Sequence, residues 1–325
     1  MSRELSEILS PIARDLDTFD RHFREAMRSK VMFVDLIARY VVKRKGKRIR
    51  PALVLLTAKA CGEINDSTHR GASLVEILHT ATLIHDDVVD DADTRRGFAS
   101  LNAVWKNKIS VLMGDYMLAK GLLLSLDNND FQFLKITSDA VRRMSEAEIL
   151  QIAKSRDLDI DEPTYLKIIS DKTASLISTC CQIGAESVAS EDAVKSSMRT
   201  FGENLGMVFQ IRDDLLDYVG RTSITGKPTG LDMKEKKLTL PLIYSLGNAP
   251  RGQSRNVLRI IKNGATKKDL RNVVDFAQEY GGIAYTEQKA DHYARVALEA
   301  LSILPPTPAR DSLSTFVDYV MARSK

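Results

Sequence analysis

Apolar residues recur along most of this chain at intervals of three and four positions, the spacing of one face of an α-helix. Residues 31–43 show the pattern at Val31, Val34, Leu36, Ile37 and Val41. Gly46 interrupts this helix, Pro51 is placed to begin the next one, and Gly62 is placed to end it. Convincing strand alternation with hairpin turns is absent from the sequence. The pattern therefore predicts an all-α fold.

The longest predicted helices are separated by short polar stretches. A helix is expected over residues 69–91, and the polar stretch DADTRRGFAS then interrupts the pattern. Further helices are expected over residues 103–126, 130–156, 163–188, 191–220, 236–247, 267–279, 283–302 and 309–322. Because no repeat, low-complexity segment or Pro/Gly-rich linker divides the chain, we predict one domain over residues 1–325, a bundle of about ten or more helices.

The composition narrows the class of protein. Hydrophobic residues make up 44% of the chain, charged residues 28% and aromatic residues 6%, and the net charge of +4 is too small to indicate a nucleic-acid partner by itself. No apolar run approaches the roughly 18 residues that cross a bilayer, so no transmembrane segment is predicted. The N-terminal residues mix acids and bases, unlike a signal peptide. The three cysteines form no disulfide framework, and the adjacent Cys180 and Cys181 are interpreted as core thiols. A cytoplasmic protein fits these features.

Two acidic clusters lie in otherwise apolar helical segments. They comprise Asp86, Asp87, Asp90 and Asp91 in LIHDDVVDDADTRRG, and Asp213, Asp214 and Asp217 in QIRDDLLDY. Residues four apart share a helix face, which places Asp86 beside Asp90 and Asp87 beside Asp91. By the same spacing, Asp213 is expected beside Asp217.

Like charges at this spacing destabilise a helix, so each cluster favours a compensating cation. Carboxylate oxygens suit Mg²⁺, which usually combines one or two carboxylates with waters and substrate phosphates. A solvated acidic face is the simpler interpretation of one such cluster. It does not suit both, because each cluster is flanked by apolar residues, as in LVEILHTATLIH and LGMVFQI.

Basic residues adjoin the predicted helix starts and the first acidic cluster. GKRIRP contributes Lys47, Arg48 and Arg50 before a helix start, where free N–H groups and the helix dipole already favour anions. Arg95 and Arg96 follow the first acidic cluster. Acids and bases interleaved in this way suit a metal-bridged diphosphate, with the acids holding the metal and the guanidinium groups holding phosphate.

Taken in order, GKRIRP, His79 seven residues before Asp86 in DDVVD, RR, KT, FQIRDDLLD and GKPTGLDMKEKKLTLP resemble the trans-isoprenyl diphosphate synthases. The resemblance extends from about residue 40 to residue 250. It implies a helical bundle around a central prenyl-binding cavity. It also implies a magnesium-dependent prenyl transferase, in which an allylic prenyl diphosphate ionises and is attacked by isopentenyl diphosphate. The product is one isoprene unit longer after loss of a proton.

The same resemblance implies roles for individual residues. Asp86 and Asp90, with Asp87 close by, bind Mg²⁺ ions at the allylic diphosphate, and Asp213, with Asp214 and Asp217 nearby, binds a further ion. The allylic diphosphate is held by Arg95, Lys172, Lys227 and Lys237. Isopentenyl diphosphate is held by Lys47, Arg50, His79 and Arg96. Thr173 and Gln210 supply dipoles toward the developing allylic cation. Catalysis is therefore expected to depend on Asp86, Asp90, Lys172, Thr173, Gln210 and Asp213.

Small departures accompany the resemblance. The family often has Gly where Ala147 and Lys236 stand, and the second departure leaves Lys236 as an alternative to Lys237 in the diphosphate clamp. Taken singly, Lys172, Thr173, Gln210, Lys227 and Lys237 are ordinary surface or core polar residues.

Product length is expected to depend on the helix before Asp86. Ala81 and Thr82, one turn below Asp86, are small, whereas the family has bulky aromatics here in enzymes that stop at farnesyl length. The small pair favours a long product, hexaprenyl to decaprenyl, for a respiratory quinone side chain. The simpler interpretation is that both residues permit close helix packing.

Several other functions remain as alternatives. They are a geranylgeranyl diphosphate synthase, a non-catalytic subunit of a heteromeric prenyl transferase, and a class I terpene cyclase. A cyclase needs no second diphosphate site, and a non-catalytic subunit would have lost motif residues. A nucleic-acid-binding module would rest on GKRIRP alone, so no nucleic acid is expected. The family implies a homodimer whose product is handed to membrane enzymes.

Overall fold

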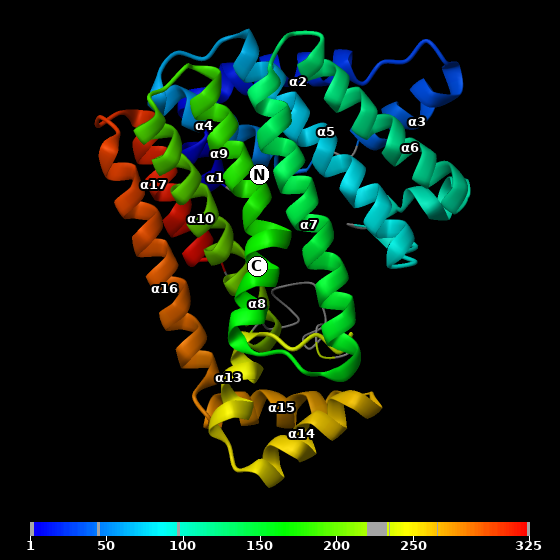
Figure 1. Ribbon diagram of the computed structural model, residues 1–325, viewed down its shortest axis with the longest axis vertical. Helices are drawn as coiled ribbons and strands as arrows, with labels where there is room; N and C mark the ends of the chain where they lie inside the picture. The colour runs from blue at the N-terminus through cyan, green and yellow to red at the C-terminus, as the bar shows by residue number, and fades with distance from the viewer. Residues whose placement is uncertain are drawn as a thin grey trace. The chain divides into compact units, whose positions relative to one another are not determined.

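The computed structural model describes residues 3–43, 46–95, 98–219, 233, 235–264 and 266–323, and it is dominated by helices (Figure 1). Up to residue 157 they are α1 (Arg3–Ile8), the 3₁₀ turn η1 (Ser10–Ile12), α2 (Ala13–Ala26), α3 (Met32–Val42), α4 (Ile49–Cys61), α5 (Asp66–Val89), α6 (Leu101–Leu126) and α7 (Phe131–Asp157). Two antiparallel strands, β1 (Thr94–Arg95) and β2 (Phe98–Ala99), lie between α5 and α6.

The remaining helices complete the all-α fold, which confirms the predicted class. They are α8 (Glu162–Ile169), the π-helix η2 (Ser170–Ala174), α9 (Ser175–Ser187), α10 (Asp192–Val219), α13 (Leu240–Asn248), α14 (Arg251–Asn263), α15 (Lys267–Glu279), α16 (Gly282–Ala300), the 3₁₀ turn η3 (Leu301–Ile303) and α17 (Pro308–Met321).

The chain forms two compact units. The first unit comprises Met1–Ser138, Thr179–Met198 and Ile303–Leu313, and the second comprises Asp139–Ser178, Arg199–Ser302 and Ser314–Lys325. A single domain over the whole chain stays a prediction.

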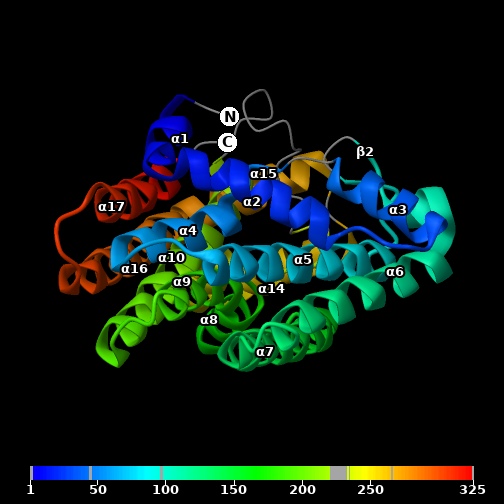
Figure 2. The same cartoon turned by 90° about the horizontal axis from the view of Figure 1, so that it is seen from above.

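In the first unit, α5 lies alongside α6 and also contacts α4 and α2 (Figures 1 and 2). The start of α5 is set by a capping box, in which the Asn65 side chain accepts from the Thr68 amide (3.1 Å) and the Asn65 amide donates to Thr68 Oγ1 (3.3 Å). Capping residues satisfy N–H groups that have no partner within the helix. The helix therefore begins at Asp66, three residues before the predicted start.

Helix α4 is buried along most of its length and is contacted closely by α9. A Cβ atom added at Gly184 would lie 2.5 Å from the Val54 carbonyl oxygen, so glycine is needed for this approach. Cys180 and Cys181 are buried here, as predicted for core thiols, and burial raises the pKa of Cys181 to about 12. Burial also raises the pKa of Cys180, so neither thiol is ionised near neutral pH.

Helix α6 is long and apolar but largely uncovered within its unit. Among the described residues it is the one helix that is long and apolar enough to cross a membrane, with a mean hydropathy of 1.4. About a third of its most apolar stretch is buried (33%). Apolar side chains exposed on α6 include Val111, Leu112, Leu122, Leu123 and Leu126. The absence of a transmembrane segment stays a prediction.

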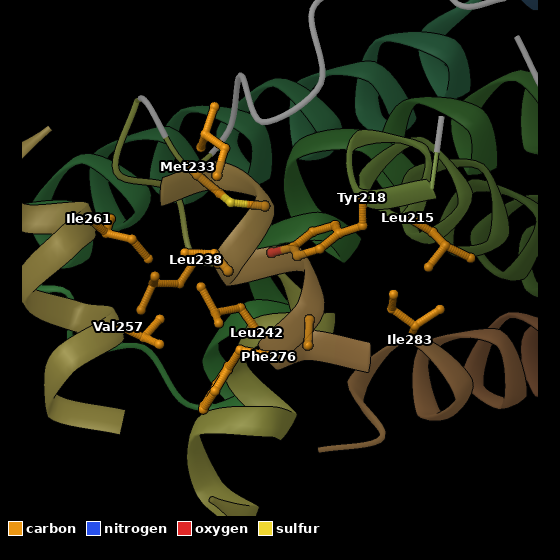
Figure 3. Packing of buried hydrophobic residues seen from close by; sticks show 12 residues of the cluster. Leu215, Tyr218, Met233, Leu238, Leu242, Val257, Ile261, Phe276 and Ile283 are labelled. Carbon is orange, nitrogen blue, oxygen red and sulfur yellow. The ribbon is translucent and has the colours of Figure 1, made fainter. Parts of the chain in front are cut away.

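In the second unit, a core joins the end of α10 to α13, α14, α15 and α16. Its members include Leu215, Tyr218, Met233, Leu238, Leu242, Val257, Ile261, Phe276 and Ile283 (Figure 3). A second cluster packs α8, η2, α10, α13 and α16 together through Tyr165, Ile169, Ala174, Met207, Ile211, Leu240 and Ala290. These clusters fix the backbone that carries the candidate site residues of this unit.

The predicted continuous helix over residues 163–188 is wrong in one respect, because the π-helix η2 divides it. A π-turn adds one residue to the helical path and leaves the apolar period intact on both sides, so periodicity does not reveal it. Helix α10 contacts this turn so closely that a Cβ added at Gly206 would overlap Ala174 Cα. Lys172 and Thr173 both lie on η2.

Other boundaries differ from the prediction for local reasons. Helix α13 begins at Leu240 rather than at residue 236, with extended Thr239 at its N-cap and Pro241 in its first turn. Helices α1, α2 and α14 were not predicted. Helix α5 ends at Val89 rather than at residue 91, because Asp91 takes the left-handed conformation with φ 49°.

Candidate active site

The first acidic cluster lies at the C-terminal end of α5. Asp87 is buried, Asp86 is half-buried and Asp90 is exposed. The Asp90 amide donates to the Asp86 carbonyl (2.8 Å), so these two residues keep the expected one-turn spacing. Asp91 lies outside the helix, and its predicted pairing with Asp87 on one helix face is lost.

The position of this cluster at the C-terminal end of α5 is electrostatically unfavourable. A helix C-terminus carries partial negative charge, and α5 has no basic residue in its last turn. Carboxylates added there are unfavourable by about 0.3–1 kcal/mol each unless a cation compensates them. The arrangement is therefore suited to binding a cation.

The N-terminus of α4 has the opposite polarity. Arg50 lies half-buried in the first turn, which contains no acidic residue, and Lys47 is exposed just before it. Arg48 forms an ion pair with Asp20 of α2 (2.6 Å). Free N–H groups together with two basic side chains form a place suited to an anion. His79, also in this unit, is half-buried on α5.

The second acidic cluster lies on α10. Asp213 has a side chain that is 41% exposed, and its Oδ1 lies 3.8 Å from Nη1 of Arg323. Asp217 is half-buried, whereas Asp214 is buried. The three carboxylates that the sequence grouped together therefore have different surroundings.

Asp214 belongs to a chain of hydrogen bonds that reaches η2. Thr173 Oγ1 donates to Gln210 Oε1 (2.8 Å), and Gln210 Nε2 donates to Asp214 Oδ1 (2.6 Å). The Tyr165 hydroxyl donates to Asp214 Oδ2 (2.7 Å). The structure thus brings together Thr173, Gln210 and Asp214, and it adds Tyr165, which sequence reasoning missed.

Lys172 is oriented by two residues of α7. Its Nζ donates to Gln151 Oε1 (2.7 Å) and forms an ion pair with Glu148. Both partners lie in EAEILQI, a segment considered only for its departure at Ala147. Lys172 and Gln151 lie 21 residues apart in sequence, so helical periodicity gives no signal of this contact.

A network of ion pairs anchors η2 beside Lys172. Arg143 Nε donates to Asp171 Oδ1 (2.7 Å), and its Nη2 donates to Glu203 Oε1 (2.6 Å) and Ser170 Oγ (3.1 Å). Burial opposes ionisation of Asp171, but hydrogen bonds from Lys167 and Arg143 outweigh it and lower the pKa of that carboxyl below 3.8. The network holds the π-turn with charged groups of both signs.

The remaining predicted residues are placed as follows. Lys237 Nζ donates to Glu235 Oε2 (2.7 Å). Lys236 has φ 58°, the left-handed region that glycine adopts without strain, which explains why the family often has Gly at this position. The backbone of Arg95 lies in β1. The Arg95 side chain, Arg96 and Lys227 lie outside the described residues.

Each acidic cluster suits a cation that is shared with substrate phosphates rather than one enclosed by protein ligands alone. Within the described ranges, no three His, Cys, Asp or Glu side chains converge as they would around a metal held by protein alone. Mg²⁺ commonly takes one or two carboxylates and completes its shell with waters and substrate phosphates. The accessible carboxylates of Asp86, Asp90 and Asp213 offer hard oxygens of that kind.

The chain is similar to known proteins over most of its length. A family model described as "Polyprenyl synthetase" matches residues 32–277. The chain is 38% identical to an all-trans-nonaprenyl-diphosphate synthase (geranyl-diphosphate specific) of Rhodobacter capsulatus, over 98% of this chain and 97% of the relative.

Two solved structures show the same fold over nearly the whole chain. A decaprenyl diphosphate synthase of Rhodobacter capsulatus has a TM-score of 0.92 at 33% identity, covering 99% of each chain. A polyprenyl synthase of Caulobacter crescentus, complexed with calcium and isoprenyl diphosphate, has a TM-score of 0.89 at 33% identity, covering 99% of this chain and 98% of that one.

The chain belongs to the polyprenyl synthetase family, and the predicted trans-isoprenyl diphosphate synthase class is confirmed. It is a prenyl transferase of isoprenoid biosynthesis. The roles of the individual site residues stay predictions.

Proposed function

We propose that this enzyme condenses isopentenyl diphosphate with an allylic prenyl diphosphate to make a long-chain all-trans polyprenyl diphosphate for a quinone side chain. The observation that carries the proposal is the α5 helix below its acidic end. Leu74 lies about 18 Å from Asp86 along this helix, and the residues one turn below Asp86 are the small Ala81 and Thr82. The nonaprenyl and decaprenyl products in the names of two relatives support a long chain.

Asp86 and Asp90, and separately Asp213, are the proposed ligands of Mg²⁺, with Asp87, Asp214 and Asp217 beside them. The calcium and isoprenyl diphosphate bound by the Caulobacter enzyme support a divalent cation at a prenyl diphosphate. When bound, the cation supplies Lewis-acid neutralisation of the departing diphosphate.

The basic residues divide between the two diphosphates in this proposal. Arg95, Lys172, Lys227 and Lys237 hold the allylic diphosphate. Lys47, Arg50, His79 and Arg96 hold isopentenyl diphosphate and so align its double bond with the allylic carbon. Support comes from the basic, acid-free N-terminal turn of α4 and from the oriented side chain of Lys172.

Thr173 and Gln210 are proposed to face the allylic cation as it forms. Both are half-buried, and their hydrogen bond fixes the direction of their dipoles. Preorganised dipoles aimed at developing charge lower a barrier without reorganising during the reaction. The departing diphosphate takes the proton that the new product loses, as the resemblance to the family implies.

A homodimer in the cytoplasm is the proposed state of the enzyme. The apolar side chains that α6 exposes, Val111, Leu112, Leu122, Leu123 and Leu126, form a surface that a second copy would cover. Gel filtration with light scattering of the wild type and of Leu122→Lys/Leu123→Lys tests this. A dimer that becomes a monomer in the double variant supports the proposal, and a monomeric wild type contradicts it.

The function is tested by incubating the wild type with farnesyl or geranyl diphosphate, isopentenyl diphosphate and Mg²⁺, followed by mass analysis. The expected products are hexaprenyl to decaprenyl diphosphates. Accumulation of geranylgeranyl diphosphate would indicate the shorter synthase instead. Turnover that requires a second, different chain would indicate a heteromeric subunit.

A further inference from the structure

The middle carboxylate of the second acidic cluster faces neighbours unlike those of Asp213. Asp214 is 5% exposed and Tyr165 is 3% exposed. Tyr165 packs in the cluster that joins α8, η2, α10, α13 and α16, and its hydroxyl donates to Asp214 Oδ2 (2.7 Å). The other oxygen, Oδ1, accepts from Gln210 Nε2 (2.6 Å). Both oxygens of this buried carboxylate are therefore engaged by neutral donors of the protein itself.

These contacts fix the direction of every hydrogen bond up to Thr173. Gln210 Nε2 donates to Asp214 Oδ1, which turns the Gln210 Oε1 away from the carboxylate. Thr173 Oγ1 lies 2.8 Å from that Oε1 and must donate its only hydrogen to it. The hydroxyl oxygen of Thr173 then keeps its lone pairs free of that bond.

This direction of the hydrogen bonds increases the partial negative charge on Thr173 Oγ1. A hydrogen bond to an ionised acceptor is stronger than one between neutral groups, and successive bonds in a chain polarise one another. The Asp214 carboxylate accepts from the Gln210 amide nitrogen, and the amide Oε1 accepts the hydroxyl hydrogen of Thr173. Tyr165 keeps Asp214 in the orientation that this chain requires.

We propose that Tyr165 and Asp214 are positioning residues that set the polarity of Gln210 and Thr173, and that Asp214 acts through this chain rather than as a metal ligand. The inference rests on the proposed function, in which Thr173 faces the allylic cation. Nothing in the spacing of QIRDDLLDY separates Asp214 from its neighbours, and Tyr165 lies 49 residues away in sequence.

A double-variant cycle tests the chain from Tyr165 to Thr173. Turnover is measured for the wild type, Tyr165→Phe, Thr173→Val and the double variant. Tyr165→Phe is expected to lower kcat about tenfold, with KM for both diphosphates changed less than about twofold. The double variant is expected to match Thr173→Val alone within about twofold, because the hydroxyl through which Tyr165 acts is already absent.

Conservative variants separate positioning from general loss of structure. In the Thr173→Ser background, which keeps the hydroxyl, Tyr165→Phe is expected to lower kcat about tenfold again. The matched control is Tyr218→Phe, which removes a buried hydroxyl (its side chain is 5% exposed) that bonds Thr239 Oγ1 (3.0 Å) in the same unit. It should leave kcat within about twofold of the wild type. Multiplicative effects in the Tyr165→Phe/Thr173→Val double variant, or equal losses in Tyr165→Phe and Tyr218→Phe, would overturn the inference.

A metal-binding measurement tests Asp214 without any turnover. Free Mn²⁺ is measured by electron paramagnetic resonance in the presence of protein and inorganic diphosphate. Asp213→Asn should weaken Mn²⁺ binding about tenfold or more, whereas Asp214→Asn should leave it within about twofold of the wild type. Equal weakening by the two variants would make Asp214 a metal ligand and overturn the inference. A wild type that elongates no primer would contradict the proposed function, and this measurement would still decide the role of Asp214.

Discussion

The two acidic clusters of this enzyme have nearly the same sequence, but the structure gives them different surroundings. On α5, Asp86 and Asp90 lie one turn apart at a helix end without basic residues, half-buried and exposed respectively. On α10, Asp213 is accessible, but Asp214 is buried and bonded to Gln210 and Tyr165. The first cluster is a concentration of negative charge, whereas the second combines Asp213 and Asp217 with the hydrogen-bond network of Asp214.

The difference shows that spacing identifies a class of site but not the role of each acid in it. An acid at a helix C-terminus requires a cation from outside the helix, because the helix dipole adds to the repulsion between carboxylates. A buried acid with two good donors is already compensated by the protein. Substitutions can therefore separate residues whose loss removes cation binding from residues whose loss disorders the scaffold.

The largest effect is expected from the accessible acids. Asp86→Ala and Asp213→Ala should each lower kcat about a thousandfold or more, since each removes a ligand from the cation that neutralises the leaving diphosphate. The circular dichroism spectrum should stay that of the wild type. Asp192→Ala, at a side chain that is fully exposed at the start of α10, is the control and should keep normal turnover. Near-normal turnover in either site variant would contradict the assignment.

The second largest effect is expected from breaking the ion-pair network that holds η2. Arg143→Met should lower the free energy of unfolding by about 2 kcal/mol, because it leaves Asp171 and Glu203 partly buried without their cation. The matched control is the neighbouring Arg142→Met. Arg142 pairs with Asp139 and Glu146 at the surface, so its loss should cost less than about 0.5 kcal/mol in urea unfolding. Equal costs would show that the network does not anchor η2.

The effect of pH on the ion pair between Arg143 and Asp171 tests the same network in a second way. The pKa of Asp171 lies below 3.8 in the folded chain, so its ion pairs stabilise the protein above pH 3.8 and lose that effect as the pH falls through the lower, folded value. The difference in stability between the wild type and Arg143→Met should therefore shrink below pH 3.8. Urea midpoints between pH 6 and pH 3 measure it, and a constant difference would show that ionisation of Asp171 is not its cause.

A smaller effect is expected where α10 contacts η2. Gly206→Ala places a Cβ in overlap with Ala174 Cα, which should cost about 1–3 kcal/mol of unfolding free energy and lower kcat by displacing Thr173. Gly247→Ala in α13 meets no atom within 4 Å and should be neutral or stabilising by about 0.5 kcal/mol. Thermal unfolding of both variants distinguishes close packing from a general intolerance of alanine.

Substitution of Ala81 is expected to have the smallest effect on rate but to change the length of the product. This residue is 1% exposed and packs in a cluster with Ile77, Ile84 and Met117. Ala81→Phe should shift the products toward farnesyl length, because the ring fills the path below Asp86. Thr82→Ser, which stays small, is the control. Products of unchanged length in Ala81→Phe would show that Ala81 serves helix packing and that the chain does not pass there.

Much of the fold, and the family, could be predicted from the sequence. Helices over residues 31–43, 103–126, 130–156, 191–220 and 267–279 correspond to α3, α6, α7, α10 and α15 within a few residues, since long apolar periods are strong signals. The family was recognisable from ordered motifs. The ends of helices were less predictable: Asn65 and Thr68 begin α5 early by a capping box, and Asp91 ends it by a left-handed turn.

The parts that could not be predicted depend on contacts between distant residues. The π-turn at η2 leaves the apolar period unchanged on either side. Tyr165, which bonds Asp214, and Gln151, which bonds Lys172, lie on other helices, 49 and 21 residues away, and no local pattern encodes which helix lies opposite. Sequence spacing grouped Asp213 with Asp214, and only the packing of α8 against α10 separates their roles.

Mg²⁺-dependent binding of diphosphate gives the most direct test of the proposed role of Asp86 and Asp213. Inorganic diphosphate is titrated calorimetrically into the wild type, Asp86→Asn and Asp213→Asn, each with and without Mg²⁺. We predict that the wild type binds diphosphate tightly only with Mg²⁺, and that each substitution weakens this binding about tenfold or more. Binding that needs no Mg²⁺ and is equal in all three proteins would contradict a cation held by these acids.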